Sequence, residues 1–213
     1  MKRIVVVGAG GHGKVVADVV RAGDAFEIAA FVDERAIQRD GDLYLGVRVL
    51  AGADALERAR ALGIGYALVA FGDCKGRLGC CERLRANGFE IVSAIHPRAV
   101  VSPDVTIGAG TVIVAGAVIN SDVRLGEAVI VNTSASVDHD CVLDDGVHIE
   151  PGAHLAGSVH VGRATTIGIG AAVTKGRRIG AHAHVGAGAV VTRDLPDAVI
   201  AYGVPARVVR ATV

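Results

Sequence analysis

A histidine between two aspartates is the residue group in this chain with the clearest potential for chemistry. The segment reads Val137-Asp138-His139-Asp140-Cys141. An imidazole exchanges a proton near neutral pH, and a neighbouring carboxylate can hold one ring nitrogen while the other acts as a general base. Either Asp138 or Asp140 could supply that carboxylate. The alternative interpretation is a solvated Asp-His-Asp turn with no chemical role.

A glycine-rich loop near the start of the chain has the composition of a phosphate-binding loop. It reads Gly8-Ala9-Gly10-Gly11-His12-Gly13 and matches GxGxxG, and Asp33 follows twenty residues after Gly13. The residue after Lys14 is Val15, so the Mg²⁺-binding hydroxyl of a phosphate-loop NTPase is missing. We expect backbone N–H groups at a helix N-terminus that suit a diphosphate. The alternative is that the glycines only allow close packing of helix and strand.

The first 95 residues alternate between strand and helix patterns, which predicts an α/β fold with a small parallel sheet and crossover helices. Ligands of such sheets bind beyond the carboxyl ends of the strands, where the glycine loop, Asp33 and Gly72 are expected. The predicted strands cover residues 4–7, 28–32, 66–71 and 90–95, and the predicted helices cover residues 14–21, 53–61 and 75–86.

A hexapeptide repeat occupies the second half of the chain. Every sixth residue from Val101 to Val191 is aliphatic, and the residue two before it is mostly small or β-branched. Because residues i and i+2 of a strand share a face, both positions should face a narrow interior. A six-residue period predicts a solenoid with three flat faces and about five coils. Glycines follow several of the aliphatic residues, where we expect turns that need a positive φ.

The histidines of the repeat are interpreted as solvent-exposed side chains, although His182 and His184 share a strand side and could form half of a metal site. His148, His154 and His160 each precede an aliphatic residue, so they should point outward from three different faces and cannot converge on one metal. Cys141 occupies a small-residue interior position, which favours a buried structural role over a nucleophilic one. The four cysteines lack metal-ligand spacing and are expected to be reduced thiols.

Composition excludes several classes of partner. The 213 residues carry no net formal charge at pH 7 and contain no Lys/Arg cluster, so neither nucleic acid nor an anionic membrane is expected as a partner. No apolar stretch approaches the roughly 20 residues of a membrane span. The opening residues run into the glycine turn, not into a signal-peptide cleavage site, so we expect a cytoplasmic protein.

Seven motifs occur in the order that one family shows, and together they cover the chain from end to end. The chain resembles the bacterial sugar acyltransferases of the sialic acid O-acetyltransferase type, which include N-acetyltransferases of nucleotide-linked 4-amino-4,6-dideoxy sugars. The motifs are the GxGGHGKV loop, a strand ending in Val-Asp, a strand ending in Gly-Asp, Ala94-Ile95-His96-Pro97, the run from Val131 to Cys141, His154-Leu155-Ala156-Gly157 and Gly203-Val204-Pro205-Ala206.

The resemblance implies an architecture and an assembly. It implies a Rossmann-like sugar-nucleotide-binding domain over residues 1–96 and a left-handed parallel β-helix acetyltransferase domain over residues 97–213. It also implies a homotrimer with active sites between neighbouring subunits. The left hand comes from the resemblance alone, because the ordinary crossover rule favours the right hand.

The resemblance also assigns roles to residues. The catalytic histidine falls on His139, with Asp138 and Asp140 adjacent and Asp140 preferred as its partner. Many relatives have Asn after the Gly-Asp or Gly-Asn pair where this chain has Cys74, which leaves the nucleotide base open. Sugar-nucleotide contacts fall on Gly10, Gly11, His12, Asp33 and Gly72, and acetyl-CoA contacts fall on His148, Gly157 and Ile169.

The expected function is therefore acetyl transfer from acetyl-CoA to the 4-amino group of a nucleotide-linked amino-dideoxy sugar, with a histidine general base, no metal and no covalent enzyme intermediate. O-acetylation of a sialic acid or another surface sugar is the second hypothesis. A hypothesis of another class is a dinucleotide-binding oxidoreductase, or another non-acyltransferase, whose solenoid serves only as a trimerising scaffold; it lacks a third segment to hold a substrate over a nicotinamide.

Overall fold

The computed structural model describes residues 1–212, which divide into two compact units, one from Met1 to Pro97 and one from Arg98 onward. The predicted boundary lies one residue before this division. The first unit contains one sheet in the order β3-β4-β2-β1-β5-β6, in which every pair is parallel except β3 with β4. Its elements are β1 (Lys2–Val7), α1 (Gly11–Ala22), β2 (Phe26–Asp33), η1 (Ile37–Arg39), β3 (Leu43–Tyr44), β4 (Val47–Ala51), α2 (Ala55–Ala61), β5 (Tyr66–Val69), α3 (Cys74–Ala86), β6 (Glu90–Ile91) and β7 (Ala94–Ile95).

Apolar runs form the centre of this sheet. Ile4, Val5 and Val6 of β1 are fully buried, as expected of a strand that is covered on both faces. All the predicted strands and helices are present, although the last predicted strand is divided into β6 and β7. The sequence analysis missed β4, which pairs with β2 after a short hairpin. No helix within the described residues is both long enough and apolar enough to cross a membrane.

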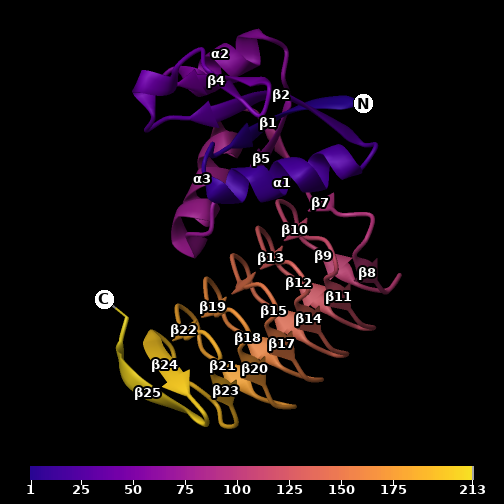
Figure 1. Ribbon diagram of the computed structural model, residues 1–213, viewed down its shortest axis with the longest axis vertical. Coiled ribbons are helices and arrows are strands. Elements are labelled where there is room, and N and C mark those ends of the chain that lie inside the picture. Colours follow the sequence, from indigo (N-terminus) through magenta and orange to yellow (C-terminus); the bar gives the residue numbers. More distant parts are fainter. Residues whose placement is uncertain (213) are drawn as a thin grey trace. The chain divides into compact units, whose positions relative to one another are not determined.

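The second unit is a three-sided parallel β-helix (Figure 1). Sixteen two-residue strands, β8 to β23, follow one another at six-residue intervals and return to the same side every third strand. β24 (Val199–Gly203) and β25 (Ala206–Ala211) end the chain as an antiparallel pair. The short strands are β8 (Val100–Val101), β9 (Thr106–Ile107), β10 (Val112–Ile113), β11 (Val118–Ile119), β12 (Arg124–Leu125), β13 (Ile130–Val131), β14 (Ser136–Val137), β15 (Val142–Leu143), β16 (His148–Ile149), β17 (His154–Leu155), β18 (His160–Val161), β19 (Thr166–Ile167), β20 (Ala172–Val173), β21 (Arg178–Ile179), β22 (His184–Val185) and β23 (Val190–Val191).

The three sides are named here by their strands. Within the second unit, face 1 contains β10, β13, β16, β19 and β22 and is extended by β24 and β25; face 2 contains β8, β11, β14, β17, β20 and β23; and face 3 contains β9, β12, β15, β18 and β21. Paired residues of β8 to β23 are 18 positions apart, as in Leu125 with Leu143, so residues of these coils stack on the residues 18 before and 18 after them. In the last coil the interval falls to 16, as in Ile179 with Leu195 and Val185 with Ala201. The turns follow the same register, since Ser158 N donates to His139 O at 2.8 Å. Residues that recur every 18 positions in these coils therefore form a straight column along the solenoid.

The predicted interior is confirmed. The aliphatic positions from Ile113 to Val191 are all buried, and the first two, Val101 and Ile107, are partly buried. Polar residues at small-residue positions are satisfied internally, since Thr165 Oγ1 donates to Gly180 O at 2.7 Å and accepts from Ala183 N at 2.9 Å. Arg177 is the large exception in this set and lies partly exposed.

The glycines after the aliphatic residues have a different purpose from the one expected. Gly162, for example, does not have a positive φ; a Cβ atom there would lie 2.5 Å from Ala181 N in the next coil. The positive φ values occur two residues later along the turn, at Ala164 or at Gly152 in the corresponding place of another turn. Close approach of stacked backbones, and not left-handed backbone conformation, therefore explains the glycine in this position.

We expect Gly162→Ala to destabilise the solenoid by about 3 kcal/mol, the upper part of the range for overpacking, because its Cβ meets backbone that cannot move alone. Gly152→Ala is the matched control. It meets open space at φ +64° and should cost only about 1 kcal/mol of left-handed strain. Denaturant unfolding of both variants measures the difference. Equal costs would contradict the close-approach explanation.

Candidate functional site

A pocket of about 390 Å³ opens at the carboxyl ends of β1, β2 and β5 in the first unit. Asp33 lines it together with Gly8, Phe71 and Asp73. Gly72 lies between Phe71 and Asp73 in the sequence. The ends of these three strands therefore lie together, as the sequence analysis expected. Its lining residues are Val7, Gly8, Val32, Asp33, Glu34, Arg35, Phe71, Asp73, Gly76, Cys80 and Arg83.

The sequence analysis missed a pair of charged residues in this pocket. Arg83 of α3 donates to Glu34 just after β2, with 2.5 Å between Nη2 and Oε2. Cys74, which stands where many relatives have Asn, is buried at the start of α3 and does not line the pocket. The sequence offered a signal for Glu34 only, because it directly follows the predicted site residue Asp33.

The glycine loop is held from outside by two side chains. Arg39 Nη1 donates to Ala9 O at 2.9 Å, and Tyr44 Oη donates to Gly10 O at 2.7 Å. These hydrogen bonds engage the carbonyl groups of Ala9 and Gly10. The loop then leads into the N-terminus of α1, where free N–H groups and the helix dipole favour the binding of an anion.

Two kinds of glycine occur in this loop. A Cβ atom at Gly13 would lie 2.4 Å from Gly8 O, so Gly13 is needed for close packing. A Cβ atom at Gly10 or Gly11 would meet nothing within 4 Å. The packing alternative for the loop therefore accounts for Gly13 but not for Gly10 or Gly11.

His12 lies half-buried in this loop and is neutral at pH 7. Burial, followed by the positive charge of Arg77, lowers the pKa of His12 to about 4. Arg77 is fully buried, and its Nη1 donates to Phe71 O at 3.2 Å and to Gly72 O at 3.1 Å. The guanidinium thus fixes the turn after β5 next to the loop after β1. The sequence analysis missed Arg77, because its position on an ordinary helix pattern shows no sign of burial.

In the second unit, His139 lies at the corner where face 2 turns into face 3, between β14 and β15. Its Nδ1 atom is 2.7 Å from Asp140 Oδ2. With Nδ1–H donating to this carboxylate, Nε2 carries the lone pair that can accept a proton. Asp140 has φ +60°, and this turn geometry brings its carboxylate beside the preceding imidazole.

Asp138 holds the backbone of the same turn and not the imidazole. Its Oδ1 accepts from His139 N at 2.9 Å and from Asn120 Nδ2 at 2.8 Å. The Asn120 hydrogen bond and then the His139 N–H lower the pKa of the Asp138 carboxyl. Asn120 was missed, although it lies 18 residues before Asp138 and the repeat therefore predicts that they stack.

Gly157 provides the space in which the imidazole lies. A Cβ atom at this position would be 2.5 Å from His139 Cε1 and 2.6 Å from Nε2. Gly157 is 18 residues after His139, so it occupies the same corner in the next coil. The residue assigned to acetyl-CoA from the resemblance is therefore also the residue whose missing side chain admits the imidazole.

A groove of about 440 Å³ runs along face 2 beside this corner. It begins at Asn120 and Asp138 and continues over apolar residues toward Thr174. His154 is one of the residues that line the groove, and its Nδ1 atom shares a hydrogen bond with Ser136 Oγ at 2.8 Å. The lining residues are Asn120, Ser136, Asp138, His154, Leu155, Ala156, Ala172, Val173 and Thr174.

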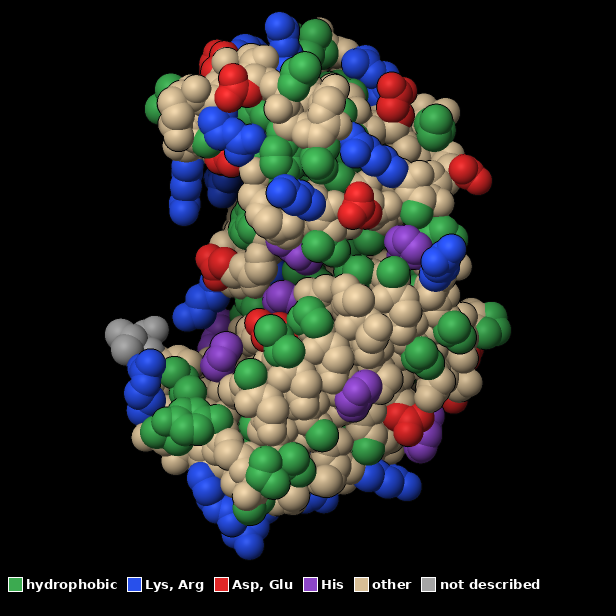
Figure 2. Space-filling view, viewed as in Figure 1, with side chains coloured by type: hydrophobic (Ala, Val, Ile, Leu, Met, Phe, Trp, Pro, Cys, Tyr) green, Lys and Arg blue, Asp and Glu red, His purple; other side chains and the backbone are tan. Residues whose placement is uncertain are grey.

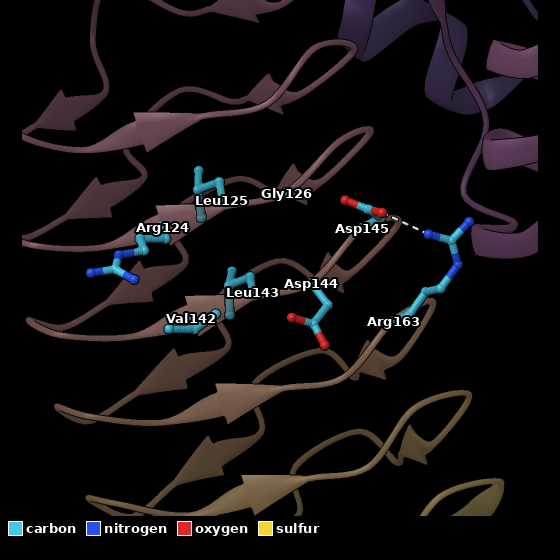
Figure 3. A pocket seen from close by; sticks show the side chains of 8 residues that line it. All are labelled: Arg124, Leu125, Gly126, Val142, Leu143, Asp144, Asp145 and Arg163. Carbon is cyan, nitrogen blue, oxygen red and sulfur yellow. Dashed lines mark hydrogen bonds and ion pairs between the residues drawn. The ribbon is translucent and has the colours of Figure 1, made fainter.

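A second groove, of about 370 Å³, lies on face 3 (Figure 3). Arg163 reaches back to Asp145, with Nη1 2.6 Å from Oδ2. The groove contains two arginines, Arg124 and Arg163, and two aspartates, Asp144 and Asp145. Its charges are therefore balanced, and it does not include the His139 corner.

The other two residues assigned to acetyl-CoA lie elsewhere on the coil. His148 is on face 1 and is buried, contrary to the expectation that it points outward. Asn132 Nδ2 donates to His148 Nε2 at 3.2 Å, and Asn132 Oδ1 is already engaged by Thr133 N. Ile169 is more than half exposed at the corner between faces 1 and 2. Within one chain, therefore, Gly157 adjoins His139 whereas Ile169 lies at a different corner.

The remaining expectations about side chains concern cysteine and metal. Cys141 is fully buried and burial raises the pKa of its thiol, as a structural role requires. Its Sγ donates to Ala156 O at 3.3 Å and accepts from Val159 N at 3.4 Å. Among residues 1–212, no group of three His, Cys, Asp or Glu side chains is arranged to hold a metal ion.

Similarity to known proteins extends over the whole chain. Residues 3–84 match the family described as the PglD N-terminal domain. UDP-N-acetylbacillosamine N-acetyltransferase of Bacillus subtilis (strain 168) is 38% identical over 117 residues, a stretch that covers 54% of this chain and 52% of that protein. The match thus spans about half the length of this curated relative.

Solved structures, of which two are described here, resemble 98% of the chain. A histidine-to-asparagine variant of perosamine N-acetyltransferase from Caulobacter crescentus, in complex with CoA and GDP-perosamine, is 44% identical with a TM-score of 0.92 and covers 98% of this chain and 97% of that one. The acetyltransferase domain of PglB from Neisseria gonorrhoeae FA1090, in complex with acetyl coenzyme A, is 39% identical with a TM-score of 0.90 and covers 98% and 99%.

These similarities agree with the architecture. The first unit has the expected Rossmann-like sheet, and the solenoid of the second unit is the expected left-handed parallel β-helix. The motifs from which the resemblance was drawn, the three-strand pocket and the His139 corner all fall within the matched length. The chain belongs to the sialic acid O-acetyltransferase (NeuD/PglD/PerB-like) family of bacterial sugar acyltransferases, within the hexapeptide-repeat superfamily.

Proposed function

We propose that this protein transfers the acetyl group of acetyl-CoA to the 4-amino group of a nucleotide-linked amino-dideoxy sugar. The observation that carries the proposal is the His139 corner, where Asp140 holds Nδ1 and Gly157 leaves room for Nε2 beside an open groove. The pocket of the first unit supports the choice of a nucleotide-linked sugar as acceptor, because it lies at the carboxyl ends of the strands, where parallel sheets bind nucleotides. Similar proteins were solved with CoA and GDP-perosamine and with acetyl coenzyme A.

The reaction needs one proton acceptor and good positioning. The acceptor nitrogen attacks the thioester carbonyl carbon, the N–C bond forms and the C–S bond breaks. His139 Nε2 takes a proton from the attacking nitrogen and passes it to the departing sulfur, which leaves as the CoA thiol. Asp140 keeps the proton on Nδ1 and stabilises the imidazolium while it exists. Holding both substrates in place supplies most of the rate enhancement, so no metal or covalent enzyme intermediate is required.

The homotrimer remains part of this proposal. Gly157 lies beside His139, whereas Ile169 lies at the corner between faces 1 and 2 and His148 lies on face 1. If all three contact acetyl-CoA, residues of two solenoids must contribute to each site. A closed ring of identical subunits would supply such pairs, since each subunit offers one corner to each neighbour.

The direct test is turnover. Purified protein is incubated with acetyl-CoA and, in separate reactions, with UDP-, GDP-, dTDP- and CMP-linked 4-amino-4,6-dideoxy sugars or with sialic acid. We expect thiol release with a nucleotide-linked amino sugar and an amide in the product by mass spectrometry. Acetylation of sialic acid alone would replace this proposal with the O-acetyltransferase hypothesis, and reduction of NAD⁺ would favour an oxidoreductase.

We expect His139→Asn to lower kcat by at least about 10²-fold, because general-base catalysis contributes roughly 10² to 10⁴. The KM values and the sedimentation coefficient should not change, since the side chain is half exposed and lies outside the core. His184→Asn is the matched control, because His184 is an exposed histidine of face 1. Unchanged turnover of His139→Asn would remove the base assignment.

The two aspartates give an internal comparison for the same assignment. Asp140→Asn should lower kcat more than Asp138→Asn, because only Asp140 contacts the imidazole. Asparagine tolerates the positive φ of Asp140, so this substitution changes the charge without straining the turn. A larger loss for Asp138→Asn would identify Asp138 as the orienting carboxylate.

We expect Gly11→Val to raise the KM for the nucleotide-linked sugar at least about tenfold and to leave the KM for acetyl-CoA unchanged. The added side chain enters open space in the free protein, so the protein folds, but it obstructs a diphosphate that approaches the N-terminus of α1. Gly79→Val on α3 is the control, since it also meets nothing within 4 Å. An unchanged sugar KM would show that the loop does not hold the acceptor.

A further inference from the structure

The pocket at the carboxyl ends of β1, β2 and β5 contains a charged pair next to Asp33. Asp33 is the last residue of β2, Glu34 follows it directly, and Arg83 reaches Glu34 from α3. All three residues line the pocket. The pair joins two elements that are far apart in sequence, and neither of its members has been given a role so far.

The pair keeps hydrogen-bonding groups available for a ligand. Arg83 Nη2 donates to Glu34 Oε2 at 2.5 Å, whereas Glu34 Oε1 makes no hydrogen bond within residues 1–212. The Arg83 side chain is 54% exposed and the Glu34 side chain 31%. Because a guanidinium has several N–H groups, Arg83 holds the carboxylate and still has donors to offer. A ligand in the pocket therefore meets two acceptor oxygens beside a donor.

The remainder of the lining near the pair suits a flat ring. Cys80 is buried, and burial raises the pKa of its thiol to about 12, so the thiol is neutral at pH 7. Phe71 adds an aromatic side chain. Aromatic side chains stack on every nucleobase with little preference. A choice among bases therefore falls to the polar groups of Glu34 and Arg83.

Long-range charge does not distinguish one nucleotide from another. Figure 2 shows Lys, Arg, Asp and Glu side chains interspersed over the visible face of the first unit, which is coloured indigo to magenta in Figure 1. The negative charge of every candidate nucleotide lies on its phosphates, so an electrostatic field would attract them all in a similar way. Selection of one nucleotide needs direct contacts with the edge of its base.

A nucleotide has a defined direction in a pocket of this kind. A helix N-terminus favours the phosphates, and an acidic residue at the end of the second strand suits the ribose hydroxyl groups. Here these features are the N-terminus of α1 and Asp33. Glu34 lies one residue beyond Asp33, so the base is the part of the nucleotide that reaches Glu34 and Arg83.

Guanine is the base whose edge matches this pair. It presents two adjacent donors, N1–H and the N2 amino group, and two acceptors, O6 and N7. Uracil and thymine present one N–H between two carbonyl groups, and cytosine presents one amino group beside an unprotonated ring nitrogen. A carboxylate has acceptors alone, so with each of the pyrimidines its second oxygen would face another acceptor.

We propose that Glu34 and Arg83 recognise the base of the acceptor nucleotide and select guanine, so that the substrate is a GDP-linked amino sugar. The two oxygens of Glu34 accept from N1–H and from the N2 amino group. Arg83, which adjoins Oε2, donates to O6, which adjoins N1. Hydrogen bonds to ionised groups are stronger than those between neutral groups, so both contacts favour guanine. This inference rests on the proposed function, because it names the substrate class of that same pocket.

Calorimetric titration of the whole protein with GDP, IDP, UDP and dTDP tests the assignment without an acyl donor. IDP is the matched ligand, because hypoxanthine is guanine without the N2 amino group. We expect GDP to bind at least about tenfold more tightly than each of the other three, the discrimination expected of a matched pair of hydrogen bonds. Binding of IDP, UDP or dTDP as tight as that of GDP would overturn the guanine assignment.

Glu34→Gln replaces one acceptor oxygen with an amide donor. The variant should bind GDP at least about tenfold more weakly than the parent, bind IDP about as before, and bind XDP more tightly than the parent, because the C2 carbonyl of xanthine accepts from the amide. A partly exposed ion pair contributes little to stability, so the variant should fold. Glu82→Gln is the matched control, since Glu82 is exposed on α3 and does not line the pocket.

Equal losses of GDP and IDP binding in Glu34→Gln, or unchanged GDP binding, would contradict recognition of the base by this carboxylate. Acetyl transfer separates the inference from the proposed function. If GDP binds with the expected selectivity but no GDP-linked amino sugar is acetylated, the proposed function fails while the guanine assignment stands. If a UDP- or dTDP-linked amino sugar is acetylated with a higher kcat/KM than the GDP-linked one, the guanine assignment fails alone.

Discussion

Hydrogen bonding between successive coils is the constraint on which the rest of the solenoid depends. From β8 to β23 each strand bonds to its counterpart 18 residues away and the turns follow the same register, so an inner coil cannot shift without breaking bonds to both neighbouring coils. This regularity brings the backbones of neighbouring coils so close together at several positions that a Cβ atom has no room there, and these positions are occupied by glycine. In return, a side chain at a corner has a fixed position relative to the side chains above and below it.

The corner that carries His139 is supported by this fixed stacking from two directions. Asn120, one coil earlier, holds Asp138 and through it the backbone N–H of His139. Gly157, one coil later, leaves the space into which the imidazole extends. The third support, Asp140, comes from the same turn and depends on a positive φ that the turn imposes. The position of the imidazole thus depends on three turns or coils: Asn120 and Gly157 are 18 or more residues away in sequence, whereas Asp140 is the next residue and is brought into contact by the turn. Such positioning matters in acyl transfer, where catalysis depends strongly on orientation.

The repeat explains how much of this was visible in the sequence. Period six predicted the interior positions, the three faces and the corner location of His139, because each depends only on which residues are apolar. The contacts of Asn120 and Gly157 depend on register between coils, and they would have followed from applying the 18-residue period to the polar positions as well. The role of Gly162 and the burial of His148 depend on how closely backbones and side chains approach, which hydrophobic pattern does not encode.

In the first unit, the sequence pattern predicted the elements and the place of the pocket but not the side-chain contacts that hold its loops. Its strands and helices were predictable from apolar runs, and the gathering of Gly8, Asp33 and the residues around Gly72 followed from the rule for parallel sheets. The burial of Arg77 was not predictable, because an arginine in a helical pattern is normally placed on the surface. Here its Nη1 atom donates to the carbonyl groups of Phe71 and Gly72 and so fixes a turn beside the pocket. The two units therefore fix their candidate sites differently. Stacked backbone fixes the corner of the solenoid, whereas the side chains of Arg77, Arg39 and Tyr44, which are buried or half-buried, fix the loops of the sheet.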